Sequence, residues 1–136
     1  MDCVFCKIVK GDIPSYKIYE NEHVFAFLDI NPVNKGHALV TPKEHAKDLF
    51  EVSEESYIET QKAVRLLAPE IKDAVGACGV NIMQNNLPCA GQVVEHLHVH
   101  IIPRFKNDGH KLWHGSAVSE QELNEIANNI TSGLSD

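Results

Sequence analysis

Hydrophobic positions in the first third of the chain occur in short runs that turn-forming residues separate. Residues 24–28 form a continuous apolar run, and the Asn-Pro step at residues 31–32 predicts a turn after it. A second run at residues 37–41 ends at Pro42, and a shorter apolar pair lies at residues 18–19. Neighbouring runs of this kind predict the strands of an antiparallel meander.

The hydrophobic period then changes to that of an amphipathic helix. Apolar residues recur three and four positions apart at Val64, Leu67, Ala68, Ile71 and Val75. Two glutamates follow Ser53, in a first turn where the helix dipole favours acidic side chains. Pro69 interrupts the stripe and predicts a kink or a lost hydrogen bond, and Gly76 or Gly79 is expected to end the helix.

Two further strands are predicted in the second half, at residues 80–84 and 96–102. A polar loop over residues 85–92 separates them, and Pro103-Arg104 is expected to end the second strand. Residues 105–115 lack a regular period and are expected to form a surface loop rather than a second site.

The last element is a predicted helix near the C-terminus. Ser119 and Glu122 form a capping box, and its apolar stripe contains Leu123, Ile126, Ala127, Ile130 and Leu134. We expect this helix to pack on the sheet or on a partner. The order of elements predicts one α+β domain over residues 1–136, with an antiparallel sheet of about five strands and one long helix. The C-terminal helix belongs to an extension over about residues 105–136.

The composition narrows the class of protein. The 136 residues suffice for one domain, and 43% hydrophobic and 23% charged residues exclude a disordered, collagen-like or coiled-coil chain. The net charge of −7 argues against nucleic-acid binding, and no apolar run approaches the roughly 20 residues of a membrane helix. The start at Met1-Asp2 lacks the basic residues of a secretory signal, so we expect a cytoplasmic protein with neither nucleic acid nor membrane as partner.

Three of the eight histidines, His96, His98 and His100, alternate with aliphatic residues. Alternate side chains of a strand share one face and lie about 6.6 Å apart, so the imidazoles would line one face while Leu97 and Val99 face a core. Buried imidazoles must be neutral and hydrogen-bonded, which makes such a row costly without a function. On these residues alone, catalysis and a metal patch are both open, and a solvated edge strand is disfavoured.

The four cysteines include one close pair, Cys3 and Cys6. Two thiolates at this spacing suit one wall of a tetrahedral zinc site, and burial as small hydrophobic residues explains them equally well. A thioredoxin-like redox pair would normally follow a strand and open a helix, whereas this pair stands at the very start of the chain.

The order of these motifs resembles the histidine triad (HIT) superfamily. Residues 96–102 carry the alternating signature, residues 27–30 resemble the end of the family's nucleoside-binding strand, and residues 36–45 resemble its next strand and turn. Asn85 and residues 91–96 follow in the family's order. The resemblance covers most of the chain and implies a HIT-like fold and a homodimer.

The resemblance implies an enzyme that cleaves at the α-phosphorus of a nucleoside phosphate. His98 would attack phosphorus and form a covalent nucleotidyl-histidine intermediate. His100 would hydrogen-bond a phosphoryl oxygen or the leaving group, with His37 on a neighbouring strand as its orienting residue. Gln92 would donate its amide to the bridging or leaving atom and position water, and backbone amides of the 85–92 loop would stabilise charge at phosphorus.

The family also implies a binding site for a purine nucleotide such as AMP or its conjugates. Asp29 would accept hydrogen bonds from both ribose hydroxyls, and it also suits a turn cap before the Asn-Pro step. Phe5, Leu28 and Ile30 would enclose the base, and Asn85 would lie near the phosphate.

Zinc-carrying members of the family bind the metal through two cysteines and two histidines. The corresponding positions here are Cys3, Cys6, His45 and His96, which implies one structural zinc ion per chain with no open coordination position. Cys78 lies outside this set and is expected to pack at the end of the long helix.

The expected substrate depends on the branch of the family. The uridylyltransferase branch has glutamine in place of His100, so the hydrolase branches fit better. We expect a hydrolase of purine nucleoside phosphoramidates or related nucleotidyl conjugates. A dinucleoside polyphosphate hydrolase is the alternative, because Pro103-Arg104 and the long tail resemble that branch. A nucleotide-binding interaction module with low turnover is a second alternative.

Overall fold

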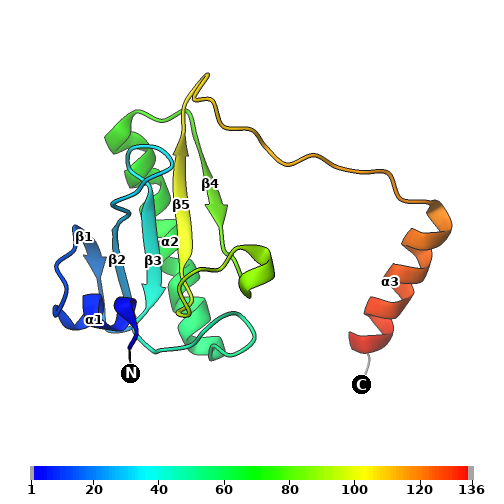
Figure 1. Ribbon diagram of the computed structural model, residues 1–136, viewed down its shortest axis with the longest axis horizontal. Coiled ribbons are helices and arrows are strands. Elements are labelled where there is room, and N and C mark those ends of the chain that lie inside the picture. The colour runs from blue at the N-terminus through cyan, green and yellow to red at the C-terminus, as the bar shows by residue number, and fades with distance from the viewer. Residues whose placement is uncertain (1, 135–136) are drawn as a thin grey trace.

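The computed structural model describes residues 2–134 and has the predicted α+β fold, built on one five-stranded antiparallel sheet (Figure 1). Residues 1 and 135–136, the two ends of the predicted 1–136 domain, lie outside the described residues. The strands are β1 (Lys17–Glu20), β2 (Val24–Leu28), β3 (Ala38–Pro42), β4 (Gly79–Met83) and β5 (Val99–Arg104). Their order in the sheet is β1-β2-β3-β5-β4. Within residues 2–134, none of the helices combines the length and apolar character that crossing a membrane requires.

The meander of β1, β2 and β3 is confirmed, whereas the histidine strand begins later than predicted. The strand β5 runs from Val99 to Arg104, so His96 and His98 precede it. The reason is that Leu97 hydrogen-bonds outside the sheet ladder: its N–H donates to the carbonyl of Ala46, and its carbonyl accepts from the Thr41 hydroxyl.

The end of β5 also differs from the prediction. Pro103 lies opposite Val80 of β4, and Arg104 lies opposite Gly79, so Pro103-Arg104 belongs to the strand instead of ending it. The strand β5 pairs with β3 through residues 99–101 and with β4 through residues 100–104, and His100 lies opposite Leu39 on one side and Met83 on the other.

The long helix α2 (Glu54–Val75) forms as predicted and covers one face of the sheet (Figure 1). It begins after Ser53, whose hydroxyl accepts a hydrogen bond from the backbone N–H of Ser56, and it ends at Gly76 with φ 69°. The helix is continuous through Pro69. Its apolar stripe packs on inward-facing strand residues in one core, made of Val24, Ala26, Ala38, Val40, Ala63, Val64, Leu67, Ile71, Val99 and Ile101.

A short helix that the sequence analysis missed, α1 (Val4–Lys10), covers the other face of the sheet. Phe5 packs there with Phe25, Phe27 and Leu39, which alternate along β2 and β3 with the residues that face α2. Cys3 caps this helix, because its Sγ accepts from the backbone N–H of Cys6. The Cys-x-x-Cys pair thus opens a helix after all.

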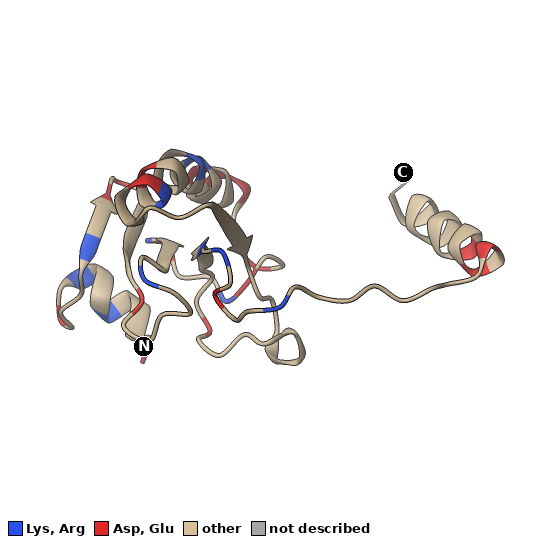
Figure 2. Ribbon diagram, turned by 90° about the horizontal axis from the view of Figure 1, so that it is seen from above, with Lys and Arg blue, Asp and Glu red and all other residues tan. Residues whose placement is uncertain are grey.

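The C-terminal helix α3 (Glu120–Leu134) forms as predicted but does not pack on the sheet. Residues 105–119 lead it away from the body of the molecule (Figure 1), and none of its residues is buried. Its stripe is accordingly exposed, with Ile130 at 59%. Figure 2 shows acidic residues near the start of α3 and no charge along the rest. The expected homodimer stays a prediction, and this stripe is apolar surface that a partner would cover.

Candidate active site

The start of β5 holds His98 in one defined tautomer. Its Nδ1 lies 2.7 Å from the carbonyl oxygen of His96, and since a carbonyl can only accept, Nδ1 carries the proton and donates. In the neutral ring, Nε2 therefore has a free lone pair. Phe5 packs edge-on against this imidazole at a centroid distance of 4.9 Å and fixes the plane of the ring.

His100 is held in the opposite tautomer by a relay through His37. The backbone N–H of Val33 donates to Nδ1 of His37 at 3.0 Å, so the neutral His37 ring carries its proton on Nε2. This Nε2 lies 2.9 Å from Nδ1 of His100 and donates to it. The proton of a neutral His100 must then be on Nε2, which makes that nitrogen a hydrogen-bond donor.

Burial keeps all three of these imidazoles neutral. It lowers the pKa of His37 and the pKa of His98 below the ordinary histidine value. For His100, burial and then the neighbouring His98 and His37 lower the pKa to about 4. At neutral pH the site therefore offers one imidazole acceptor, on His98, beside one imidazole donor, on His100.

A cavity of about 640 Å³ opens in front of these two histidines. The structure places seven predicted nucleotide-site residues along it: Phe5, Leu28, Asp29, Ile30, Asn85, His98 and His100. The cavity wall also contains apolar residues that were not predicted from the sequence, among them Ile8, Ile13 and Pro14. The apolar spacing of Val4, Phe5 and Ile8, ended by Gly11, is the signal that could have indicated α1 and this wall.

Asp29 lies at the edge of the cavity, at the end of β2. Its Oδ1 accepts from the backbone N–H of Asn31 at 2.8 Å, which is the turn-capping contact that the sequence allows. Its Oδ2 lies 3.7 Å from Nε2 of His37. The turn cap uses one carboxylate oxygen, and the carboxylate keeps further lone pairs for a ligand.

Gln92 lies next to the cavity loop and not among the cavity-lining residues of the described chain. Its Oε1 accepts from the backbone N–H of Leu87 at 2.8 Å, and its Nε2 donates to the carbonyls of Lys47 and Val94. Both amide protons are thus bound to backbone, and the side chain holds the loop that contains the 3₁₀ turn Pro88–Ala90.

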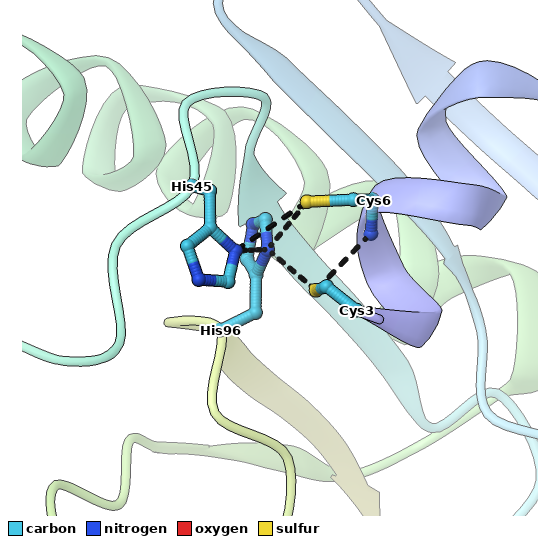
Figure 3. A group of neighbouring side chains, drawn as sticks. All are labelled: Cys3, Cys6, His45 and His96. Atoms are coloured by element: carbon cyan, nitrogen blue, oxygen red, sulfur yellow. Dashed lines mark hydrogen bonds between the residues drawn. The ribbon is translucent and has the colours of Figure 1, made fainter. Parts of the chain in front are cut away.

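The second cluster brings together Cys3, Cys6, His45 and His96 (Figure 3). The Nδ1 atoms of the two histidines are 3.2 Å apart, and Cys6 Sγ lies 3.4 Å from Nδ1 of His45. Cys3 Sγ lies 3.3 Å from Nδ1 of His96. A tetrahedral zinc ion separates two nitrogens by about 3.4 Å and a nitrogen from a sulfur by about 3.6 Å. The donor set therefore fits zinc.

The tautomer of His96 also suits a metal ligand. Its Nε2 donates to the carbonyl of Pro42 at 2.8 Å, so the lone pair of the neutral ring is on Nδ1, which faces the two thiols. Burial lowers the pKa of His96 and favours this neutral ring. Cys78 and Cys89 are exposed and lie outside the cluster, and the expected packing of Cys78 at the helix end is wrong.

Comparison with known proteins decides the family. A family model described as "HIT domain" matches residues 10–107. The chain belongs to the HIT family. It is 43% identical over 137 residues to adenosine 5′-monophosphoramidase hnt1 of Schizosaccharomyces pombe, a match that covers 98% of this chain and 99% of that protein.

Solved structures with the same fold agree with this assignment. The structure of SMU.412c from Streptococcus mutans superposes with a TM-score of 0.94 at 41% identity, covering 98% of this chain and 86% of that one. A zinc-bound histidine triad family protein from Mycobacterium smegmatis superposes with a TM-score of 0.75 at 36% identity, covering 98% of this chain and 96% of that one.

We predict that His100 makes this HIT protein less stable in mild acid. Its pKa is about 4 in the folded protein but about 6.5 in an unfolded chain, so the unfolded state binds the proton first as the pH falls. The free energy of unfolding should fall between about pH 6.5 and about pH 4, and because solvent screens this partly exposed ring, His100 should account for at most about 2 kcal/mol of the loss. Urea unfolding of the wild type and His100→Gln across this range measures the effect. A stability difference between them that does not change with pH would contradict it.

Proposed function

We propose that this HIT-family nucleotide hydrolase cleaves purine nucleoside phosphoramidates or related nucleotidyl conjugates at the α-phosphorus. The observation that carries the proposal is the pair of opposite tautomers on one cavity wall, with a free lone pair on His98 Nε2 and a proton on His100 Nε2. A displacement at phosphorus needs a nucleophile and a donor to the leaving group. The relative named adenosine 5′-monophosphoramidase supports this substrate class.

The proposed reaction has two displacements. His98 Nε2 forms a bond to phosphorus and the phosphorus–nitrogen bond to the amine breaks, while His100 Nε2–H donates a hydrogen bond to the departing nitrogen. The amine leaves with a proton taken from a water molecule, the hydroxide so formed adds to phosphorus, and the bond to His98 breaks. The nucleoside monophosphate and both neutral imidazoles result.

The rest of the cavity would hold the nucleoside. The carboxylate of Asp29 accepts hydrogen bonds and cannot donate them, which suits two ribose hydroxyls. Phe5, Leu28 and Ile30 supply apolar surface for a purine, and Asn85 lines the same cavity as the two histidines. Recognition by neutral imidazoles and amides explains how an acidic chain with a net charge of −7 can take a phosphate ester.

Replacing His98 tests the proposed nucleophile. We expect His98→Ala to lose turnover of adenosine phosphoramidate while AMP binding, measured by calorimetry, is retained. Wild type quenched with denaturant at alkaline pH, where the phosphorus–nitrogen bond of the adduct survives, should carry a covalent adenylyl group, identified by mass spectrometry, that the variant lacks. His114→Ala, an exposed histidine outside the cavity, is the control and should keep wild-type turnover.

Full turnover by His98→Ala would refute the mechanism, and a wild type that binds AMP without any covalent adduct would favour a binding module. A higher kcat/KM for diadenosine polyphosphates than for the phosphoramidate would favour the dinucleoside polyphosphate hydrolase instead.

We propose further that Cys3, Cys6, His45 and His96 bind one structural zinc ion per chain. The support is the tetrahedral fit of the four donor atoms and the neutral Nδ1 of His96. Zinc has no open coordination position with four protein ligands, so its contribution is to folding. It would tie α1, which supplies a wall of the cavity, to the segment that leads into β5.

Metal analysis tests the zinc site. We expect about one zinc ion per chain in the wild type and in Cys89→Ser, whose cysteine is exposed, and much less in Cys6→Ser. The melting temperature of Cys6→Ser should fall with the zinc content, because binding free energy of the metal is folding free energy. Zinc retained by Cys6→Ser but lost from His98→Ala would place the metal at the catalytic histidines and overturn the assignment.

A further inference from the structure

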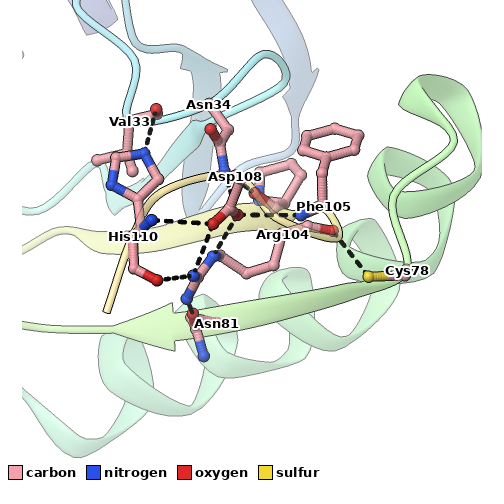
Figure 4. Close-up of polar contacts among 9 residues, drawn as sticks. Val33, Asn34, Cys78, Asn81, Arg104, Phe105, Asp108 and His110 are labelled. Carbon is pink, nitrogen blue, oxygen red and sulfur yellow. Dashed lines mark hydrogen bonds and ion pairs between the residues drawn. The ribbon is translucent and has the colours of Figure 1, made fainter. Parts of the chain in front are cut away.

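A polar cluster at the far end of β5 lies outside the cavity, and none of its residues is among those that line the cavity (Figure 4). We call it the arginine cluster; its members are Asn34, Asn81, Arg104, Asp108 and His110. Arg104 and Asp108 form its centre through a two-point ion pair, with Nε to Oδ2 at 2.8 Å and an outer nitrogen to Oδ1 at 3.0 Å. Such planar, two-point pairs are the geometrically most defined of ion pairs.

Asp108 organises the chain that leaves the sheet. Its carboxylate accepts from the backbone N–H groups of Phe105 and His110, both at 3.1 Å. Arg104 donates in addition to the carbonyl of His110 at 2.9 Å and to Asn81 of β4 at 2.7 Å. The Arg104 guanidinium beside it holds the pKa of Asp108 well below its usual range, so the carboxylate is charged at neutral pH.

The arginine cluster also forms hydrogen bonds with the loop between β2 and β3. Asn34 donates from Nδ2 to Asp108 Oδ2 at 3.0 Å and to the carbonyl of Pro103 at 2.9 Å. His110 donates from Nε2 to the carbonyl of Val33 at 3.1 Å. Residues 30–33 of this loop are exposed, so packing alone holds this part of the loop weakly.

The arginine cluster is connected to the reaction site through the backbone of Val33, which bonds to His110 on one side and to His37 on the other. The backbone N–H of Val33 is the group that sets the tautomer of His37, and His37 in turn sets the tautomer of His100. If Val33 moves away, Nδ1 of His37 can carry the proton, and its Nε2 becomes an acceptor. His100 would then donate from Nδ1, and its Nε2 would lose the proton that makes the hydrogen bond to the leaving group.

We propose that Asn34, Asp108 and His110 are positioning residues that keep His100 in its donor tautomer by holding Val33 in place. The expected effect on kcat rests on the proposed function. The expected effect on the tautomers of His37 and His100 rests on the chain of hydrogen bonds alone. A role in the reaction is thereby assigned to the start of the C-terminal extension, a segment outside the cavity.

Two asparagine variants of the same cluster separate positioning from general stability. Asn34→Ala removes two of the three side-chain hydrogen bonds between the loop and the cluster, whereas Asn81→Ala removes one hydrogen bond from Arg104 and none from the loop. We expect Asn34→Ala to lower kcat for adenosine phosphoramidate about tenfold with KM nearly unchanged, because the donor acts as the bond to the leaving group breaks. Asn81→Ala should keep kcat within about twofold.

A second readout does not depend on activity. Nitrogen-15 spectra of the histidine side chains report which ring nitrogen is protonated. We expect His37 and His100 to be protonated on Nε2 in the wild type and in Asn81→Ala, and to show a mixture of tautomers in Asn34→Ala and in Asp108→Asn, which keeps the shape of the side chain.

The kinetic and spectroscopic results distinguish a failure of the positioning role from a failure of the proposed function. Equal losses of kcat in both asparagine variants, or wild-type tautomers in Asn34→Ala and Asp108→Asn, would overturn the positioning role. If the wild type has no turnover of the phosphoramidate, the proposed function fails, and the nitrogen-15 spectra still decide whether the arginine cluster sets the tautomers.

Discussion

The hydrogen bond from His98 Nδ1 to the carbonyl of His96 is the contact on which the site depends. This hydrogen bond is short, at 2.7 Å, and leaves Nε2 of the neutral His98 ring without a proton. It lies within the chain segment that carries the three alternating histidines. His96 turns its own bare Nδ1 toward the two thiols, while His98 turns Nε2 toward the cavity. Two adjacent histidines of the same motif thus serve different sites because their protons are held by different backbone carbonyls.

Burial and hydrogen bonding work together in this arrangement. Desolvation disfavours the imidazolium form, and the acceptors that are present determine where the single proton of each neutral ring lies. The site therefore presents a lone pair and a proton side by side without any fixed charge on the histidines. The composition, with few basic residues, therefore does not indicate phosphate chemistry. The spacing of the histidines indicates it instead.

The elements that the sequence predicted well are those whose hydrophobic period is long or clearly bounded, such as β2 and the helix that Ser53 and Gly76 enclose. The helix α1 was missed because it has only seven residues and a cysteine cap. The start of β5 could not be predicted, because the Leu97 backbone bonds to Ala46, 51 positions away. The expected donor role of Gln92 came from the family, whereas its backbone contacts depend on how two loops meet. The exposure of α3 depends on residues 105–119, whose path no local pattern encodes.

The proposed reaction depends on the positions of three imidazole protons, and neutron diffraction from crystals near neutral pH observes them directly. The tautomers derived from the hydrogen-bond partners predict deuterium on Nδ1 of His98 and on Nε2 of both His37 and His100. They predict none on Nε2 of His98, the nitrogen that faces the cavity. Deuterium on that atom would contradict its role as the nucleophile.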